Sequence, residues 1–192
     1  MNFALGKANA LVSFCGSAYQ LTSTPGVACE FADGSESWLH FVPTYKHRGT
    51  FLTSDHGLDV ELAARIGMAK SAFTAFTHLS RPLLTNRHLP TVIRLRLFQA
   101  LISSKLFFGL GAWHTLSPKQ LQRLTRFYVK TLKRVLRWPV DLWTQTNAQV
   151  FAAAHVFDVR ARLAVDRLLY AQRVFAIGSF FLQNVIHLQA AI

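Results

Sequence analysis

Residues 117–138, SPKQLQRLTRFYVKTLKRVLRW, decide the fold because they hold the clearest helix-start signal in the chain. Ser117 can cap a helix, Pro118 suits its first position, and Gln120 stands three residues after Ser117, as in a capping box. Apolar residues then recur at spacings of three and four, which predicts one buried helix face ending near Trp138. That apolar stripe consists of Leu121, Leu124, Tyr128, Leu132 and Val135.

The basic residues of the same helix form a second stripe, offset from the apolar one by about 200°. It consists of Lys119, Arg123, Arg126, Lys130, Lys133 and Arg137. Such a stripe is either a solvated surface or a binding site for phosphate groups. Solvated faces normally mix charges of both signs, so a stripe of one sign favours phosphate binding.

The charges of the whole chain are segregated in the same way. Lys and Arg number 21 against nine Asp and Glu, giving a net charge of +12 over 192 residues. Residues 62–140 hold fourteen Lys or Arg and no acid. This excess indicates an anionic partner, either nucleic acid or an acidic membrane surface.

The pattern along the chain predicts an α+β fold, with a small N-terminal antiparallel β element followed by a mainly α-helical bundle. Residues 1–57 read as β-rich, with a turn at TPGVA (24–28) and breaks at Pro43 and Gly49. Residues 58–140 read as a basic bundle of three helices, and residues 141–192 as additional C-terminal helices.

The first two helices of the predicted bundle differ in how much of their surface is apolar. The first runs from Leu58 towards Pro82 with one apolar face, and Asp59 and Glu61 lie in its first turn. The second, over residues 90–108, is apolar on two faces, which predicts a central helix packed from both sides. One face holds Ile93, Leu97 and Leu101, and the other holds Leu95, Phe98, Ile102 and Leu106.

Two features bear on compartment and membrane association. Cys15 and Cys29 make no disulfide framework, so free thiols in a reducing compartment, the nucleus or the cytoplasm, are the simpler interpretation. Residues 174–192 could span a bilayer by length, but Gln and Asn recur along them, which suits a buried or interfacial helix better. A membrane partner is therefore the less favoured alternative.

Signatures of catalysis are absent from the sequence. The nine acids include no adjacent pair closing an apolar strand, which two-metal nucleotidyl transfer would need. The histidines do not form H-E-x-x-H, and no nucleotide-binding glycine motif occurs. Composition and spacing alone predict a basic binding module without its own catalytic centre or cofactor.

Three stretches, taken in order, resemble the C-terminal part of reverse transcriptases from LINE-type (non-LTR) retrotransposons. MNFALGKANALVSFCG (1–16) is similar to the element that follows the catalytic strand. YKHRGTFLTSDHGLDVELAARIGMAKSAF (45–73) is similar to the primer-grip hairpin with the first thumb helix. RLRLFQALISSKLFFGLGAWHTLSPKQLQRLTRFYVKTLKRVL (94–136) is similar to the next two thumb helices.

The resemblance implies a role for each matching segment. Residues 1–57 would be a palm remnant with the primer grip, and residues 58–140 would be a thumb-like bundle. Lys7 would lie near the phosphates of the incoming nucleotide, as a proton donor. Tyr45, Lys46 and Gly49 would hold the primer 3′ end, while Arg65, Lys70 and the basic stripe would follow the backbone of an RNA–DNA or DNA primer–template in a sequence-tolerant way.

The resemblance also sets an expectation about activity. An RNA-directed DNA polymerase needs Mg²⁺ held by the palm aspartates, which this chain lacks, so the chain is expected to be inactive unless palm and fingers regions are supplied. The alternative function is that of an interfacial, membrane-associated basic helical protein.

Overall fold

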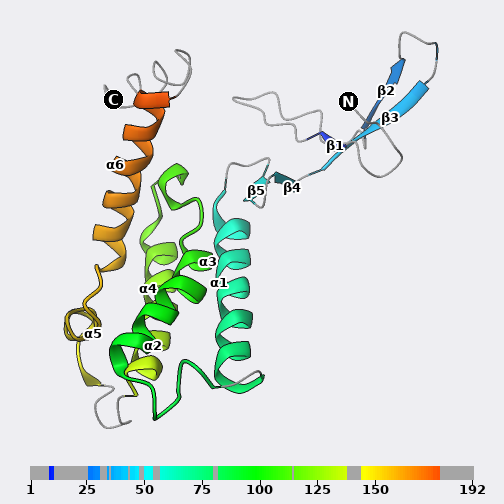
Figure 1. Ribbon diagram of the computed structural model, residues 1–192. Helices are drawn as coiled ribbons and strands as arrows, with labels where there is room; N and C mark the ends of the chain where they lie inside the picture. Colours follow the sequence, from blue (N-terminus) through cyan, green and yellow to red (C-terminus); the bar gives the residue numbers. More distant parts are fainter. Residues whose placement is uncertain are drawn as a thin grey trace. The chain divides into compact units, whose positions relative to one another are not determined.

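The computed structural model has the predicted α+β architecture, with a small strand region followed by helices (Figure 1). It describes residues 9–10, 26–30, 34, 36–42, 44–47, 50–53, 57–79, 82–113, 115–137 and 144–177. The chain divides into two compact units, Met1–Glu61 and Leu62–Ile192.

The first unit contains one three-stranded sheet of order β1-β3-β2. Strand β2 (Gly26–Glu30) pairs antiparallel with β3 (Glu36–Phe41), and the short β1 (Asn9–Ala10) pairs with β3 in parallel. The turn predicted for residues 24–28 is wrong in its second half, because Gly26 to Ala28 already lie in β2. Their ladder with β3 outweighs the local turn preference of a Pro-Gly pair.

A two-stranded hairpin precedes the first helix, as the sequence predicted. Strands β4 (Thr44–His47) and β5 (Thr50–Thr53) pair antiparallel, with Tyr45 opposite Leu52 and Lys46 opposite Phe51. The backbone N–H of Phe51 donates to Oε2 of Glu61 at 2.7 Å, and Glu61 is only 1% exposed. Glu61, which the sequence predicts only to favour the start of the helix, therefore also anchors the hairpin to the first turn of α1.

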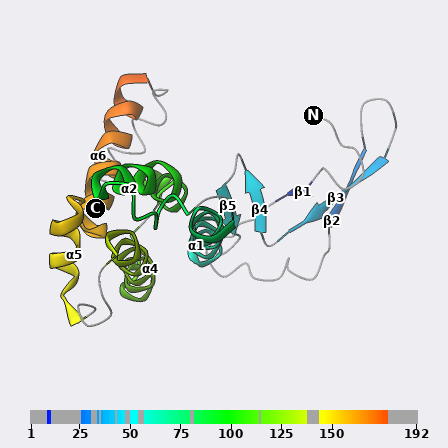
Figure 2. The same ribbon diagram turned by 60° about the horizontal axis from the view of Figure 1, so that its bottom comes forward.

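The helices alternate with short irregular turns. They are α1 (Asp59–Thr74), the π-helical turn Ala75–Leu79, α2 (Thr91–Phe98), the π-helical turn Gln99–Ser103, α3 (Ser104–Leu106), the 3₁₀ turn Leu110–Ala112 (here η4), α4 (Pro118–Leu136), α5 (Asn147–Ala154) and α6 (Val159–Ile177). In both ribbon views α2 and α4 lie between α1 on one side and α5 with α6 on the other (Figures 1 and 2).

Capping boxes begin two of these helices. The predicted box of α4 is confirmed, since Ser117 N–H donates to Gln120 Oε1 at 2.9 Å and Gln120 N–H donates to Ser117 Oγ at 3.3 Å. Thr146 and Gln149 make the same reciprocal pair at the start of α5. The Thr-x-x-Gln spacing is visible in the sequence and gives the second helix start as clearly as the first.

Tyr128 of α4 is the centre of the core of the second unit. Its ring lies 5.8 Å from that of Phe98 (α2), 5.0 Å from that of Phe107 and 6.1 Å from that of Phe151 (α5), all within the range of favourable aromatic pairs. Burial raises the pKa of Tyr128. The rest of the predicted stripe is buried here too, except Leu121, which is half-buried.

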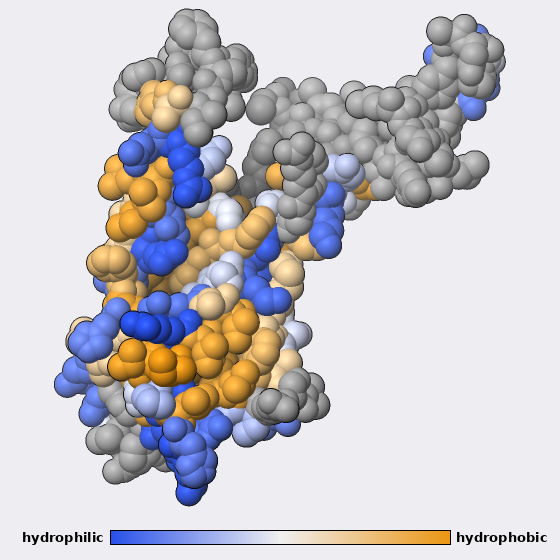
Figure 3. Space-filling view, in the orientation of Figure 1, coloured by the Kyte–Doolittle hydropathy of each residue, from blue (hydrophilic) through white to orange (hydrophobic). Residues whose placement is uncertain are grey.

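The second helix is not packed from both sides as predicted. Its Leu95, Phe98, Ile102 and Leu106 face is buried, whereas Ile93 on the other face is 39% exposed. Leu97 and Leu101 are half-buried, and apolar side chains gather on the surface over α2 (Figure 3). Amphipathic periodicity identified both faces but could not tell which one finds a partner.

Helix α6 packs closely on the turn η4 through a glycine. A Cβ added to Gly111 would lie 2.6 Å from the backbone oxygen of Asp166 and 2.7 Å from Cβ of Tyr170. Arg167 of α6 also donates from Nη2 to the carbonyl of Trp113 at 3.3 Å. Only a residue without a side chain permits this approach of two backbones.

Replacing Gly111 by Ala should therefore destabilise the protein by about 1–3 kcal/mol, because α6 or the turn must shift to accept the methyl group. Gly67→Ala is the matched control, since a Cβ there has nothing within 4 Å and the residue lies in α1. That control should gain about 0.5–1 kcal/mol of helix propensity. Urea denaturation followed by far-UV circular dichroism measures both; equal stability of the two variants would contradict this packing.

Candidate nucleic-acid interface

The exposed side of α4 carries six cations, here called the cationic face. It consists of Lys119, Arg123, Arg126, Lys130, Arg134 and Arg137, all exposed. At 100° and 1.5 Å per residue the five within α4, from Lys119 to Arg134, fall within an arc of about 80° and extend along about 22 Å, and Arg137 follows as the left-handed C-cap residue. Within the described part of the chain, none of the six has an ion-pair partner.

The charge on this face has an energetic cost in the isolated protein. Neighbouring members are three or four residues apart, so each repels the next on the helix surface. At about 0.2–0.5 kcal/mol a pair, the four such pairs within α4 destabilise it by roughly 0.8–2 kcal/mol. A bound polyanion would remove that repulsion, and the buried face around Tyr128 maintains the helix without it.

A shallow groove of about 400 Å³ runs beside the cationic face, here called the α1–α4 groove. Its lining comprises Ile66 of α1 and, from α4, Lys119, Gln122, Arg123, Arg126, Phe127 and Lys130. Four of the seven residues are cations of the cationic face. The groove therefore combines positive charge with a small apolar floor.

Lys133 departs from the basic stripe that the sequence predicted. Its side chain is only 7% exposed, and Nζ donates to the carbonyl of Gln145 at 3.3 Å, ahead of α5. Arg134, one residue further on, is exposed and takes its place on the cationic face. Lys133 thus ties the end of α4 to the segment that leads into α5.

Two further arginines of the basic block lie in the interior. Arg94 is 6% exposed; its guanidinium donates to the carbonyl of Val135 at 2.5 Å and to Oγ1 of Thr91 at 2.9 Å. Arg65, predicted as a backbone contact, is 5% exposed, with Cζ 4.4 Å from the ring centroid of Phe108. Both side chains stabilise the fold and are not placed to reach a ligand directly.

Arg94 acts as a remote cap of α4. The last carbonyls of a helix have no partner within it, and Arg94 satisfies that of Val135 from another helix. Burial lowers the pKa of Arg94, and the nearby charge of Arg137 lowers it further, but an arginine side chain stays protonated in proteins. The charge thus faces the negative end of the α4 dipole.

The remaining predicted site residues belong to other elements. Lys46 is exposed on β4, with Nζ 5.7 Å from the ring centroid of Phe51, and Tyr45 beside it is half-buried. Lys70 is exposed on α1, one turn after Ile66. Lys7 and Gly49 lie outside the described residues.

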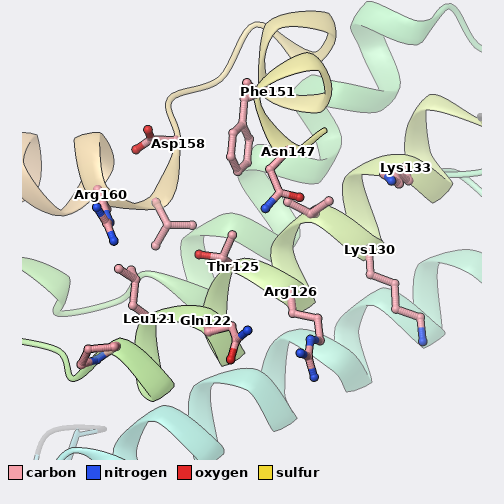
Figure 4. A pocket seen from close by; sticks show the side chains of 14 residues that line it. Leu121, Gln122, Thr125, Arg126, Lys130, Lys133, Asn147, Phe151, Asp158 and Arg160 are labelled. Atoms are coloured by element: carbon pink, nitrogen blue, oxygen red, sulfur yellow. The ribbon is translucent and has the colours of Figure 1, made fainter. Parts of the chain in front are cut away.

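A larger groove of about 800 Å³ lies on the other side of α4, here called the α4–α5 groove (Figure 4). Its floor is apolar, with Leu121 and Val129 of α4, Phe151 of α5 and Val159 of α6. Arg126 and Lys130 line it as well, although their charged ends extend away from α5 in Figure 4. These two residues thus form a ridge between the two grooves. No sequence pattern predicts this groove, because it depends on how α5 and α6 pack on α4.

Acidic residues are few in the described part of the second unit. Asp158 accepts from the backbone N–H of Ala161 at 2.6 Å, at the start of α6, and Asp166 pairs with Arg162 at 2.9 Å. The described residues contain no group of three or more His, Cys, Asp or Glu that could hold a metal ion.

Among the described helices, none is long and apolar enough to cross a bilayer. Most of the apolar segment 174–192 lies outside the described residues.

Comparison with protein-family models, curated proteins and solved structures gave no match for this chain.

Replacing Arg94 by Met should destabilise the protein by about 1–3 kcal/mol, because the carbonyl of Val135 would be left buried without its donor. Arg96→Met is the control, since Arg96 is exposed on the same helix and its loss should change stability by no more than about 0.5 kcal/mol. Urea denaturation measures both variants. If Arg94→Met were as stable as Arg96→Met, the capping role of Arg94 would be wrong.

Proposed function

We propose that this chain binds the sugar–phosphate backbone of nucleic acid through the cationic face of α4. The observation that carries the proposal is the row of six exposed cations along α4 and its C-cap, with no acid in residues 62–140 and no ion-pair partner in the described chain. Backbone phosphates are the abundant ligand that matches a long row of positive charge.

The dimensions of the face support a polymeric ligand. Phosphates of one strand follow each other at about 3.4 Å along a duplex axis, so the row of about 22 Å from Lys119 to Arg134 runs beside roughly seven of them. Six cations at intervals of about 4.5–6 Å can then contact most of that run. Lys and Arg contacts of this kind carry no base information, so binding is sequence-tolerant.

We further propose that the chain derives from a non-LTR retrotransposon reverse transcriptase, with α1, α2–α3 and α4 as its thumb-like part. The hairpin β4–β5 directly ahead of α1 supports this order of elements. Tyr45, Lys46 and Gly49 would then contact the primer end, and Lys7 the nucleotide phosphates. In this proposal the 192 residues bind primer–template but do not polymerise without palm aspartates, supplied by an upstream region or in trans.

A membrane surface is the second candidate, because apolar side chains are exposed on two helices of the second unit. Val92 of α2 is 60% exposed and Leu168 of α6 is 71% exposed, and Figure 3 shows apolar surface over both helices. Flotation with vesicles containing anionic lipid separates this candidate from the first. Co-flotation that Leu168→Glu abolishes, without any binding to nucleic acid, would favour the membrane.

The nucleic-acid proposal predicts that the loss of binding affinity depends more on where positive charge is removed than on how much is removed. Lys119→Gln with Arg123→Gln should weaken binding to an RNA–DNA hybrid about tenfold or more, because two backbone contacts are lost. Arg87→Gln with Arg96→Gln removes the same charge from exposed positions elsewhere and should weaken binding by no more than about threefold.

Fluorescence anisotropy with a labelled hybrid measures both pairs, and the dependence on salt adds a second test. If all six cations contact phosphates, log K should fall against log salt with a slope of about −5 in the unmodified protein. In the Lys119/Arg123 variant the magnitude of that slope should decrease by about 2. Equal losses for the two variants, or no binding at all, would refute the proposal.

A further inference from the structure

The α4–α5 groove shares Arg126 and Lys130 with the surface proposed to bind nucleic acid but is otherwise lined by different residues. Thr125, Ala148, Phe151 and Arg160 line this groove and not the α1–α4 groove, whereas Lys119 and Arg123 line the α1–α4 groove alone. Its volume of about 800 Å³ is twice that of its neighbour. The question is therefore which kind of molecule fits a groove with this lining.

The length and floor of the groove fit a helix. Along α4 the lining runs from Pro118 to Lys133, which is about 22 Å or four helical turns. Leu121, Thr125 and Val129 succeed one another at one-turn intervals and form the α4 side of the floor. An amphipathic helix can place residues at i, i+4, i+7 and i+11 against such a floor.

The rim gives the sign of the occupant's charge. Arg160 lies on the α6 side, and Arg126 and Lys130 lie on the α4 side, against Asp158 as the acid of the lining. The flexible Arg126 and Lys130 can turn their charged ends towards either groove while their stems stay on the protein. The occupant should therefore have acidic flanks.

A nucleic-acid strand fits this groove less well. Single strands bind by stacking bases on accessible aromatic rings. The aromatic residue of the lining is Phe151, which is 8% exposed because its ring packs against that of Tyr128. The rest of the floor, Leu121, Thr125, Val129 and Val159, offers no ring on which a base could stack.

We infer that the α4–α5 groove binds an acidic amphipathic helix of a partner protein. Because Arg126 and Lys130 line both grooves, a bound acidic helix would withdraw them from the cationic face. The groove is thus a second binding site whose occupation opposes nucleic-acid binding; this last consequence rests on the proposed function, whereas binding of the helix does not.

The direct test uses the full chain and a labelled, amidated peptide of about 18 residues, with leucines at i, i+4, i+7 and i+11 and glutamates beside them. Two control peptides have the same composition in scrambled order, or lysine in place of glutamate. We expect the acidic amphipathic peptide to bind at least about tenfold more tightly than either control.

Matched variants then locate the site. Ala148→Tyr places a ring in the groove and should weaken peptide binding about tenfold, while Ala153→Tyr, at an exposed alanine of α5 outside the lining, should change it by less than about twofold. Arg160→Glu adds no bulk to the groove and should also weaken the peptide, so a folding defect in Ala148→Tyr would not leave the inference untested. Ala148→Tyr should leave binding of the hybrid unchanged.

The outcomes separate the two proposals. Failure of the acidic peptide to bind, equal binding of the scrambled peptide, or equal binding by Ala148→Tyr and Ala153→Tyr would overturn the inference. Loss of hybrid binding in Ala148→Tyr would assign the groove to nucleic acid instead.

A competition experiment tests the link between the two sites. Saturating peptide should weaken hybrid binding about fivefold or more, and an unchanged hybrid affinity would refute the competition. An absence of hybrid binding without peptide would refute only the proposed function.

Discussion

The packing of Tyr128 against three phenylalanine rings is the interaction on which the rest of the helical unit depends. Phe98, Phe107 and Phe151 come from different elements and meet the same ring of α4. Their contacts fix the rotation of α4 about its axis, so that its apolar stripe faces inward. Since the cations occupy the opposite side, the same packing also determines that six of them face outward together.

The structure divides the cations of residues 62–140 into two uses. Arg94, Lys133 and Arg65 are buried, and each satisfies a carbonyl or covers a ring inside the fold. The cations of the outer face of α4 have no such partner in the described chain. A count of positive charge therefore overestimates the binding surface, because part of the charge stabilises the helix ends and the packing between helices.

Periodicity and capping signals predicted the helices well. The box at Ser117, the apolar stripe of α4 and the hairpin ahead of α1 were all foreseen, because each depends on residues that are close in the sequence. The buried state of Lys133 could not be foreseen, since its acceptor belongs to the segment before α5. The exposed face of α2 and the start of β2 at Gly26 likewise depend on which surfaces meet, and periodicity does not contain that information.

The residues of the cationic face were predicted from the sequence only in part. Lys119, Arg123, Arg126 and Lys130 lie side by side on one exposed face because helical spacing alone aligns them. Arg134 was missed, although its position on the helix is within the same arc, and the α4–α5 groove needed the placement of two further helices. Local sequence thus predicted the charged surface but not the cavity next to it.

Lysine footprinting tests the central claim, the outward cationic face, most directly. The protein is acetylated with and without a bound RNA–DNA hybrid, and the modification of each lysine is measured by mass spectrometry. The account predicts that Lys119 and Lys130 react in the isolated protein and are protected by the hybrid, that exposed Lys105 reacts in both, and that buried Lys133 reacts in neither. Rapid modification of Lys133, or equal protection of Lys105 and Lys119, would contradict it.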